Sequence, residues 1–184
     1  KMTALLKKDS TVPPKAVLEA MEKRLETMKK NLAGQQVAVY PIHLAKGKAP
    51  GCTKRLIDAI NNRGLFKAVA GTADPSLNVE GSHNEQRVLW GAAREFGKFI
   101  KKNPPRTDYA LYLDYGVCGP EVKIPDGIKR EASYVHLILC TKAGEVVMVD
   151  FQNSHHGDFK QIMPKTCQDC DRLALVRLAA RLGK

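Results

Sequence analysis

Residues 36–42 read QVAVYPI, a short apolar run rich in β-branched side chains. Such a run predicts a strand. Runs of the same character predict four more strands, at 65–70, 109–117, 132–140 and 145–151. Between the last two, Lys142-Ala143-Gly144 predicts a hairpin turn, with glycine where a positive φ is wanted. The chain is therefore expected to build its core around a five-stranded sheet.

Amphipathic helices are predicted before, between and after these strands. Over 13–34, apolar residues spaced by three and four form one stripe. A second helix follows the loop at 45–51 and ends near Gly64. Sequences of capping form start two more helices, at Ser82 and Thr166. Strand–helix–strand units imply right-handed parallel crossovers, whereas the closing hairpin is antiparallel.

These elements predict one α/β domain with a mixed sheet (α+β mixed), in the order α-β-α-β-α-β-β-β-α. It is expected to cover 13–184, with the helix at 13–34 and the sheet domain at 36–184, behind a flexible segment at 1–12. No apolar run approaches the roughly 20 residues that cross a bilayer, so no membrane span is expected.

The composition is strongly basic. Lys and Arg number 30 against 19 Asp and Glu, and the formal net charge is +11. This excess indicates an acidic partner. The sequence nevertheless has no long basic tract and little aromatic interleaving, which speaks against nucleic acid. Nucleic-acid binding is therefore kept only as a second alternative function.

The hydrophobic runs resemble a group of bacterial cell-envelope domains. Residues 37–42, VAVYPI, are similar to the first strand of this group, and 107–113, TDYALYL, to a later one. The segments 56–66 and 135–149 agree in order. The group includes the amino-terminal domain of TolB, the curli secretion lipoprotein CsgG and the penicillin-binding-protein activator LpoB. The resemblance covers about 36–182 and implies a periplasmic, secreted or lipoprotein-like adaptor without an active site; a cytoplasmic location is the alternative.

Five cysteines require an explanation. An oxidising compartment, which the resemblance implies, would allow structural disulfides. Cys167 and Cys170 could pin the start of the last helix, and Cys52 and Cys118 both fall at the carboxyl edge of the sheet, within expected bridging reach. Cys140 lies inside an apolar strand and is expected to be a buried thiol. The predicted disulfides are Cys167–Cys170 and Cys52–Cys118.

The same cysteines allow a different hypothesis. Cys167-x-x-Cys170 at a helix start suits redox chemistry or a metal, because the helix dipole stabilises thiolates there. Zinc or another transition metal would need four ligands, and His155 or His156 could supply one more. No cofactor is expected in the preferred interpretation.

A small ligand, if there is one, is expected in a cleft lined by 45–52 and 116–120. The candidates are His43, Lys46, Lys48 and Asp114, because open α/β sheets bind ligands beyond the carboxyl ends of their strands. His136, in a later strand, is expected to be half-buried and hydrogen-bonded.

The common enzyme motifs are missing, among them the phosphate-binding loop and the nucleophile elbow. The preferred hypothesis is therefore a non-enzymatic cell-envelope domain that binds or assembles with a protein. Its expected surfaces are a sheet edge and the first helix, either of which could also make a homodimer. The alternative is the metal- or redox-linked module at Cys167 and Cys170.

Overall fold

A computed structural model of the chain describes residues 15–44, 47–48, 50–77, 85–116, 122–123, 129–130 and 134–182. The helices are α1 (Lys15–Asn31), α2 (Pro50–Asn62), α3 (Glu85–Lys102), α4 (Gly157–Ile162) and α5 (Cys167–Leu182). The strands are β1 (Gln36–Val39), β2 (His43–Leu44), β3 (Gly47–Lys48), β4 (Lys67–Ala70), β5 (Tyr109–Tyr115), β6 (Val122–Lys123), β7 (Lys129–Arg130), β8 (Tyr134–Thr141) and β9 (Val146–Asn153). The segment predicted to be flexible, 1–12, lies outside the described residues.

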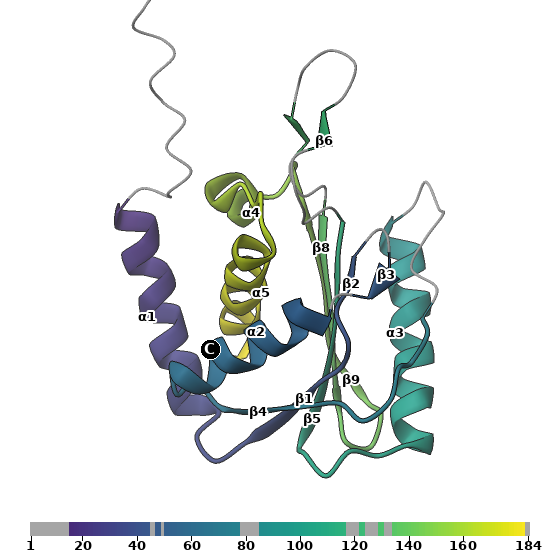
Figure 1. Cartoon of the computed structure of the whole chain (residues 1–184). Coiled ribbons are helices and arrows are strands. Elements are labelled where there is room, and N and C mark those ends of the chain that lie inside the picture. The colour runs from purple at the N-terminus through teal and green to yellow at the C-terminus, as the bar shows by residue number, and fades with distance from the viewer. Residues whose placement is uncertain are drawn as a thin grey trace, which may run out of the picture.

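The main sheet is mixed, and its long axis runs β4–β1–β5–β8–β9 (Figure 1). β1 is parallel to both β4 and β5, whereas β8 and β9 are antiparallel to their neighbours. β2 continues beside β5 after β1, and β3 folds back on β2. The predicted mixed α/β class is confirmed.

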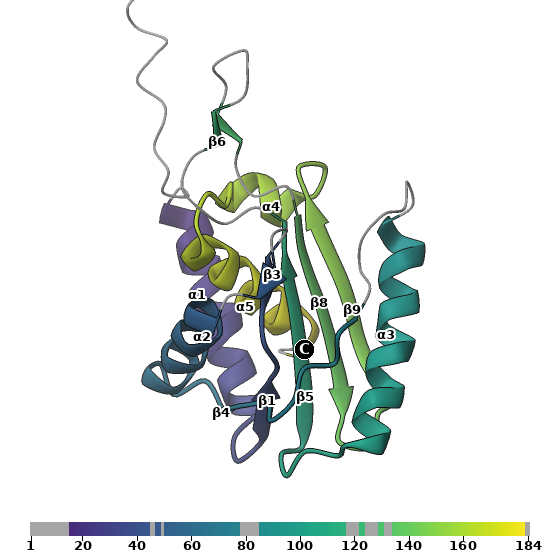
Figure 2. The same cartoon turned by 45° about the vertical axis from the view of Figure 1, so that its right-hand side comes forward.

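Two apolar layers lie on opposite faces of the sheet because side chains alternate along each strand. In β5, Leu111, Leu113 and Tyr115 join the layer under α1, α2 and α5, while Ala110 and Tyr112 join the layer under α3. Figure 2 shows α3 alone on its side of the sheet. One face is therefore thickly covered, and the other depends on a single helix.

The first helix packs on its own domain. Its apolar stripe buries Met21, Leu25 and Met28, and it lies against α5. The side-chain amide of Asn31 donates a hydrogen bond of 3.0 Å to the carbonyl of Leu182. No helix in the described part of the chain is long and apolar enough to span a membrane.

The position of α3 is fixed by two glycines. A Cβ atom on Gly97 would come within 2.5 Å of the carbonyl oxygen of Gly144, in the turn between β8 and β9. Gly144 also has φ +81°, which favours glycine. The end of α3 therefore lies directly against this hairpin and runs beside β9.

Some boundaries differ from the prediction. The run 36–42 is not one strand: it stops at Val39 and resumes as β2 at His43. Pro41, in the gap, has no amide hydrogen to donate to a sheet ladder. The short helix α4 was not predicted.

Candidate recognition groove at the open edge of the sheet

β9 is a long edge strand. It pairs with β8 on one side, and no other described strand pairs with it. Its sequence is VVMVDFQN, and Val146 and Val147 remain 36% and 42% exposed. An edge with unpaired main-chain groups and β-branched side chains is a template on which another strand can form. This edge is eight residues long.

A groove of about 230 Å³ lies beside the second half of β9. Val149 and Phe151 reach it from the α3 face of the sheet, whereas Asp150 and Gln152 reach it from the opposite face. Because residues of both faces line it, the groove wraps around the open edge of the strand. Its full lining is Leu89, Trp90, Val149, Asp150, Phe151, Gln152, His156 and Arg177.

Trp90 is the only tryptophan of the chain and is 46% exposed. Its neighbour Leu89 is buried, as are Ala93 and Phe96 on the inner side of α3. The inner side chains hold the helix on the sheet, so the indole ring is presented at the rim of the groove. A large aromatic side chain that is half exposed beside a groove is typical of a binding surface.

Charges on the other side of the groove are neutralised within the protein. Arg177 of α5 donates two hydrogen bonds to Asp150 of β9: Nε to Oδ2 at 2.8 Å, and Nη2 to Oδ1 at 2.9 Å. Its third nitrogen, Nη1, donates to Asp158 at 2.8 Å. These hydrogen bonds, above all those that Asp150 accepts, raise the pKa of the Arg177 guanidinium. Arg177, Asp150 and Asp158 therefore form one side of the groove and link α5 to the edge strand β9.

One residue that lines the groove, Gln152, has a buried polar atom without a described partner. Gln152 is 4% exposed, and its Nε2 donates to Asp150 at 3.3 Å. Its buried carbonyl oxygen has no hydrogen-bond partner among the described residues. A buried acceptor without a partner costs free energy, which a bound donor would recover.

His155 and His156, the two candidate metal-binding histidines, lie close to the groove. The ring of His156 meets Phe151 edge to face, with centroids 5.0 Å apart, and its Nδ1 lies 2.8 Å from Asn153 Oδ1. His155 is exposed in the turn after β9. Among the described residues, no three His, Cys, Asp or Glu side chains form a group that could hold a metal. The structure thus does not gather Cys167, Cys170 and either histidine into a metal site.

The predicted cleft residues lie at the carboxyl edge of the parallel strands. His43 and Asp114 are register partners across β2 and β5, and His43 Nε2 lies 3.4 Å from Asp74 Oδ1. Lys48 is the partner of His43 in β3, whereas Lys46 lies outside the described residues. The structure therefore brings three of the four candidates to neighbouring register positions, and His43 and Asp114 lie side by side on the face covered by α3.

His136 belongs to the same row, which the sequence did not indicate. Its Nδ1 is 3.6 Å from Asp114 Oδ2, and its ring stacks on Tyr134 at 4.2 Å. It is buried, not half-buried, and neither ring nitrogen has a described hydrogen-bond partner. The hydroxyl of Tyr112 and Asp114 Oδ2 lack described partners as well. Burial, and then the charge of Asp114, raises the pKa of Tyr112.

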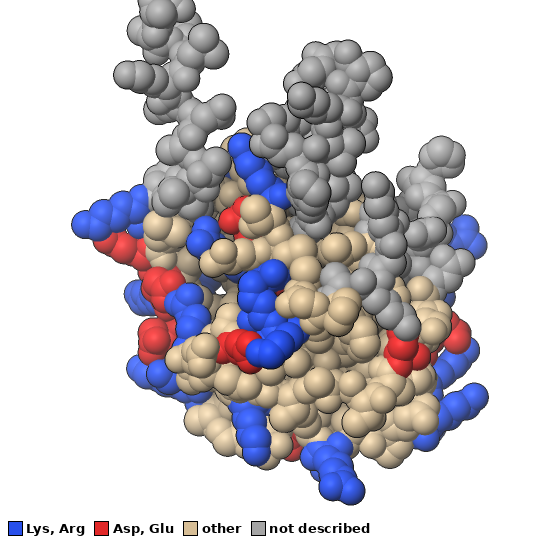
Figure 3. Space-filling view, in the orientation of Figure 1, with Lys and Arg blue, Asp and Glu red and all other residues tan. Residues whose placement is uncertain are grey.

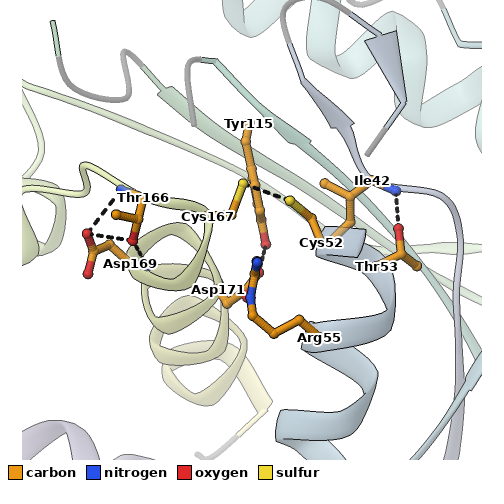
Figure 4. Close-up of polar contacts among 9 residues, drawn as sticks. All are labelled: Ile42, Cys52, Thr53, Arg55, Tyr115, Thr166, Cys167, Asp169 and Asp171. Carbon is orange, nitrogen blue, oxygen red and sulfur yellow. Dashed lines mark hydrogen bonds and ion pairs between the residues drawn. The ribbon is translucent and has the colours of Figure 1, made fainter. Parts of the chain in front are cut away.

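The structure brings together two cysteines that the sequence did not predict as a pair. Cys52 near the start of α2 and Cys167 at the start of α5 bring their sulfur atoms to 2.7 Å (Figure 4). Cys167 and Cys170 are both in the thiol form, so the Cys167–Cys170 bridge is not formed in this structure. Cys118, the other predicted partner of Cys52, lies outside the described residues. Cys140 is a fully buried thiol, as predicted, and burial raises its pKa to about 12.

A partly buried ionic network lies next to these sulfur atoms. Arg55 donates two hydrogen bonds, of 2.9 and 2.7 Å, to one carboxylate oxygen of Asp171. The hydroxyl of Tyr115 donates to the other oxygen at 2.7 Å (Figure 4). Burial raises the pKa of Asp171, and the hydrogen bonds from Tyr115 and Arg55 oppose that shift. The network ties α2, α5 and the end of β5 together.

The chain matches no family model, no curated protein and no solved structure in the comparisons made. The resemblance to the TolB, CsgG and LpoB group therefore stays a hypothesis drawn from the sequence.

Proposed function

We propose that this protein is a binding domain that takes up an extended segment of a partner protein as an added strand along β9. The observation that carries the proposal is the groove around the open edge of β9, with half-exposed Trp90 at its rim and buried Gln152, whose carbonyl has no described partner, in its lining. Strand addition gives affinity through main-chain hydrogen bonds and specificity through side-chain pockets.

The edge itself supports this mode of binding. β9 carries one charged residue, Asp150, whose charge is already neutralised by Arg177. Natural edge strands commonly carry charges, prolines or bulges that prevent pairing. β9 has one such irregularity, at Val147, where its pairing with β8 shifts by one residue, but Met148–Asn153 pair in regular register, and Val146 and Val147 are exposed. An edge with this composition is favourable for a partner strand.

Trp90 and Gln152 give the groove a way to select its ligand. An apolar side chain of the added strand would lie between Trp90 and Phe151, and a donor on the same segment would satisfy the buried Gln152 oxygen once that side chain turns toward the groove. A site that buries an unpaired acceptor discriminates against ligands lacking the matching donor. The groove therefore favours an extended segment with both an apolar and a donor group.

Charge indicates the chemistry of the partner. Arg87 and Arg94 are exposed on α3, three residues before and four after Trp90, and so lie on its side of the helix. Lys98, Lys101 and Lys102 are exposed further along. Figure 3 shows Lys and Arg side chains projecting along the side that α3 occupies. With a net charge of +11, the domain is suited to a segment rich in Asp or Glu.

We place this binding in the cell envelope. The support for that compartment is the sequence resemblance, together with cysteines that lie close enough to bridge.

The test uses random 12-residue peptides displayed on phage and selected against the full chain. Enriched peptides should alternate apolar and polar residues and be rich in Asp or Glu. Synthetic copies should change the fluorescence of Trp90, which is the only tryptophan. Val147→Asp and Trp90→Ala should each weaken their binding at least tenfold.

Ala70→Asp is the matched control, because it adds the same charge to the exposed end of β4, at the opposite edge of the sheet. It should bind like the unaltered protein. Selection that yields no common pattern, or peptides that bind Val147→Asp unchanged, would overturn the proposal.

A second candidate function is favoured by the polar row at the carboxyl edge. Tyr112, Asp114 and His136 are each at most 4% exposed and keep unsatisfied polar atoms. A small ligand with donor and acceptor groups could satisfy them. A thermal-shift screen with small polar compounds tests this, and stabilisation that disappears in Asp114→Asn would support it. Stabilisation of both proteins alike, or of neither, would contradict it.

A further inference from the structure

We infer that Cys52 and Cys167 are joined by a disulfide bond when the protein folds in an oxidising compartment. The two sulfur atoms lie 2.7 Å apart although the residues are 115 positions apart in the chain. A disulfide places its sulfurs at about 2.05 Å, so bridging needs a further approach of under about 1 Å. The bond would covalently link the start of α2 to the start of α5.

Hydrogen bonds hold the α2 side of the pair in place. The hydroxyl of Thr53, next to Cys52, accepts a hydrogen bond of 2.9 Å from the amide of Ile42. Arg55, one turn further on, is fixed by Asp171 of α5. The start of α2 is therefore tied both to the sheet and to the helix that carries Cys167 (Figure 4).

A capping box at the start of α5 holds the segment that carries Cys167. The amide of Asp169 donates to Thr166 Oγ1 at 3.2 Å, and Asp169 Oδ2 accepts from the amide of Thr166 at 3.1 Å. This reciprocal pair fixes the residue before Cys167. With both helix starts fixed, the approach of the two sulfurs results from the fold, not from two mobile side chains.

The surroundings favour a permanent bridge over a catalytic dithiol. Cys52 is 8% exposed, and burial, followed by contact with Cys167, raises its pKa to about 11. A thiol that stays protonated at neutral pH is a poor nucleophile. Rapid redox cycling through Cys52 is therefore disfavoured, and a bond made once during folding would persist.

The bond forms by thiol–disulfide exchange with a disulfide oxidant, such as oxidised glutathione. Cys167, which is more exposed than Cys52, attacks the oxidant as a thiolate and releases one thiol. Cys52 then loses its proton and displaces the second thiol from the mixed disulfide. Two cysteine thiols become one disulfide, two electrons and two protons leave them, and the oxidant is reduced to two thiols.

Peptide mapping of the full chain tests the pairing. The protein is folded with oxidised glutathione, alkylated in denaturant without reductant and digested with trypsin. Cys52 lies in APGCTK (49–54), and Cys167 and Cys170 share TCQDCDR (166–172). The expected product is APGCTK linked to TCQDCDR, with one alkyl group on the latter. Fragmentation should place that group on Cys170.

Two cysteine variants give a second, separate identification of the residue that is bonded to Cys52. In Cys170→Ser the linked peptide should persist, whereas in Cys167→Ser the Cys52 peptide should lose this partner. If Cys167→Ser does not fold, Cys170→Ser with fragmentation still decides. The inference is overturned if TCQDCDR carries an internal bridge, if APGCTK is linked to the peptide of Cys118 (107–123), or if all five cysteines are alkylated.

Discussion

Gly97 of α3 and Gly144 of the β8–β9 turn meet backbone to backbone, without room for a side chain on either residue. This contact sets how closely the helix approaches the hairpin, and therefore where Trp90 lies relative to the edge strand. It connects the packing of one helix with the shape of the groove.

Gly97→Ala should force the helix away from the turn. Its methyl group would meet the Gly144 carbonyl at 2.5 Å, and overpacking of this kind typically costs about 1–3 kcal/mol. Urea denaturation should show a lower unfolding free energy, and the emission of Trp90 should shift. Gly91→Ala is the control on the same helix, since its Cβ would meet nothing within 4 Å. Gly91→Ala should be neutral or stabilising, and an equal loss in both variants would contradict the packing argument.

Reduction should destabilise protein that was folded under oxidising conditions. A bridge closing a loop of 115 residues restricts the unfolded chain, and the loop-entropy model gives about 5 kcal/mol for this length. Adding a reductant should therefore lower Tm by on the order of 10 °C. Calorimetry with and without reductant measures the shift. The double variant Cys52→Ser/Cys167→Ser should not respond, and a response equal to that of the unaltered protein would assign the stabilisation to other cysteines.

Asp114→Asn should raise Tm. The carboxylate of Asp114 is 2% exposed, and its Oδ2 has no hydrogen-bond partner among the described residues. Burying a charge in this way costs free energy, whereas the amide keeps the shape and removes the charge. Thermal unfolding followed by circular dichroism gives the sign. A marked loss of stability would mean that Asp114 is structural, and would weaken the second candidate function.

Arg177→Lys should destabilise the wall of the groove. Lysine cannot reproduce the two-pronged contact with Asp150 together with the bond to Asp158, and its loss should cost about 1–3 kcal/mol. Chemical denaturation measures the change. Arg181→Lys, on an exposed position of the same helix, is the matched control and should change the unfolding free energy by less than about 0.5 kcal/mol. Equal stability of the two variants would contradict a structural role for the cluster.

The sequence predicted the framework well because hydrophobic period and turn residues are local signals. The continuous apolar, β-rich run of β5 and the three-and-four spacing of α1 were sufficient to place both elements. The six-residue helix α4 escaped because it is too short to show a period. The break at Pro41 was missed because the run around it is apolar on both sides.

The sites were predicted less completely because they depend on contacts between distant segments. His43 and Asp114 were chosen from their place after strands, but His136 joined them only through the register of β8 on β5. The approach of Cys52 to Cys167 has no local signature either, and the CxxC spacing directed attention to Cys170 instead. Trp90 was not selected, although a lone tryptophan beside the inner side of a helix was a usable signal.

The exposed valines of the edge strand β9 also affect the solubility of the purified protein. An edge strand that can pair with a segment of a partner protein can also pair with β9 of a second copy of this chain at high protein concentration. Solubility should then be limited by concentration when the chain is produced alone, and co-production with an occupant of that edge should relieve the limit.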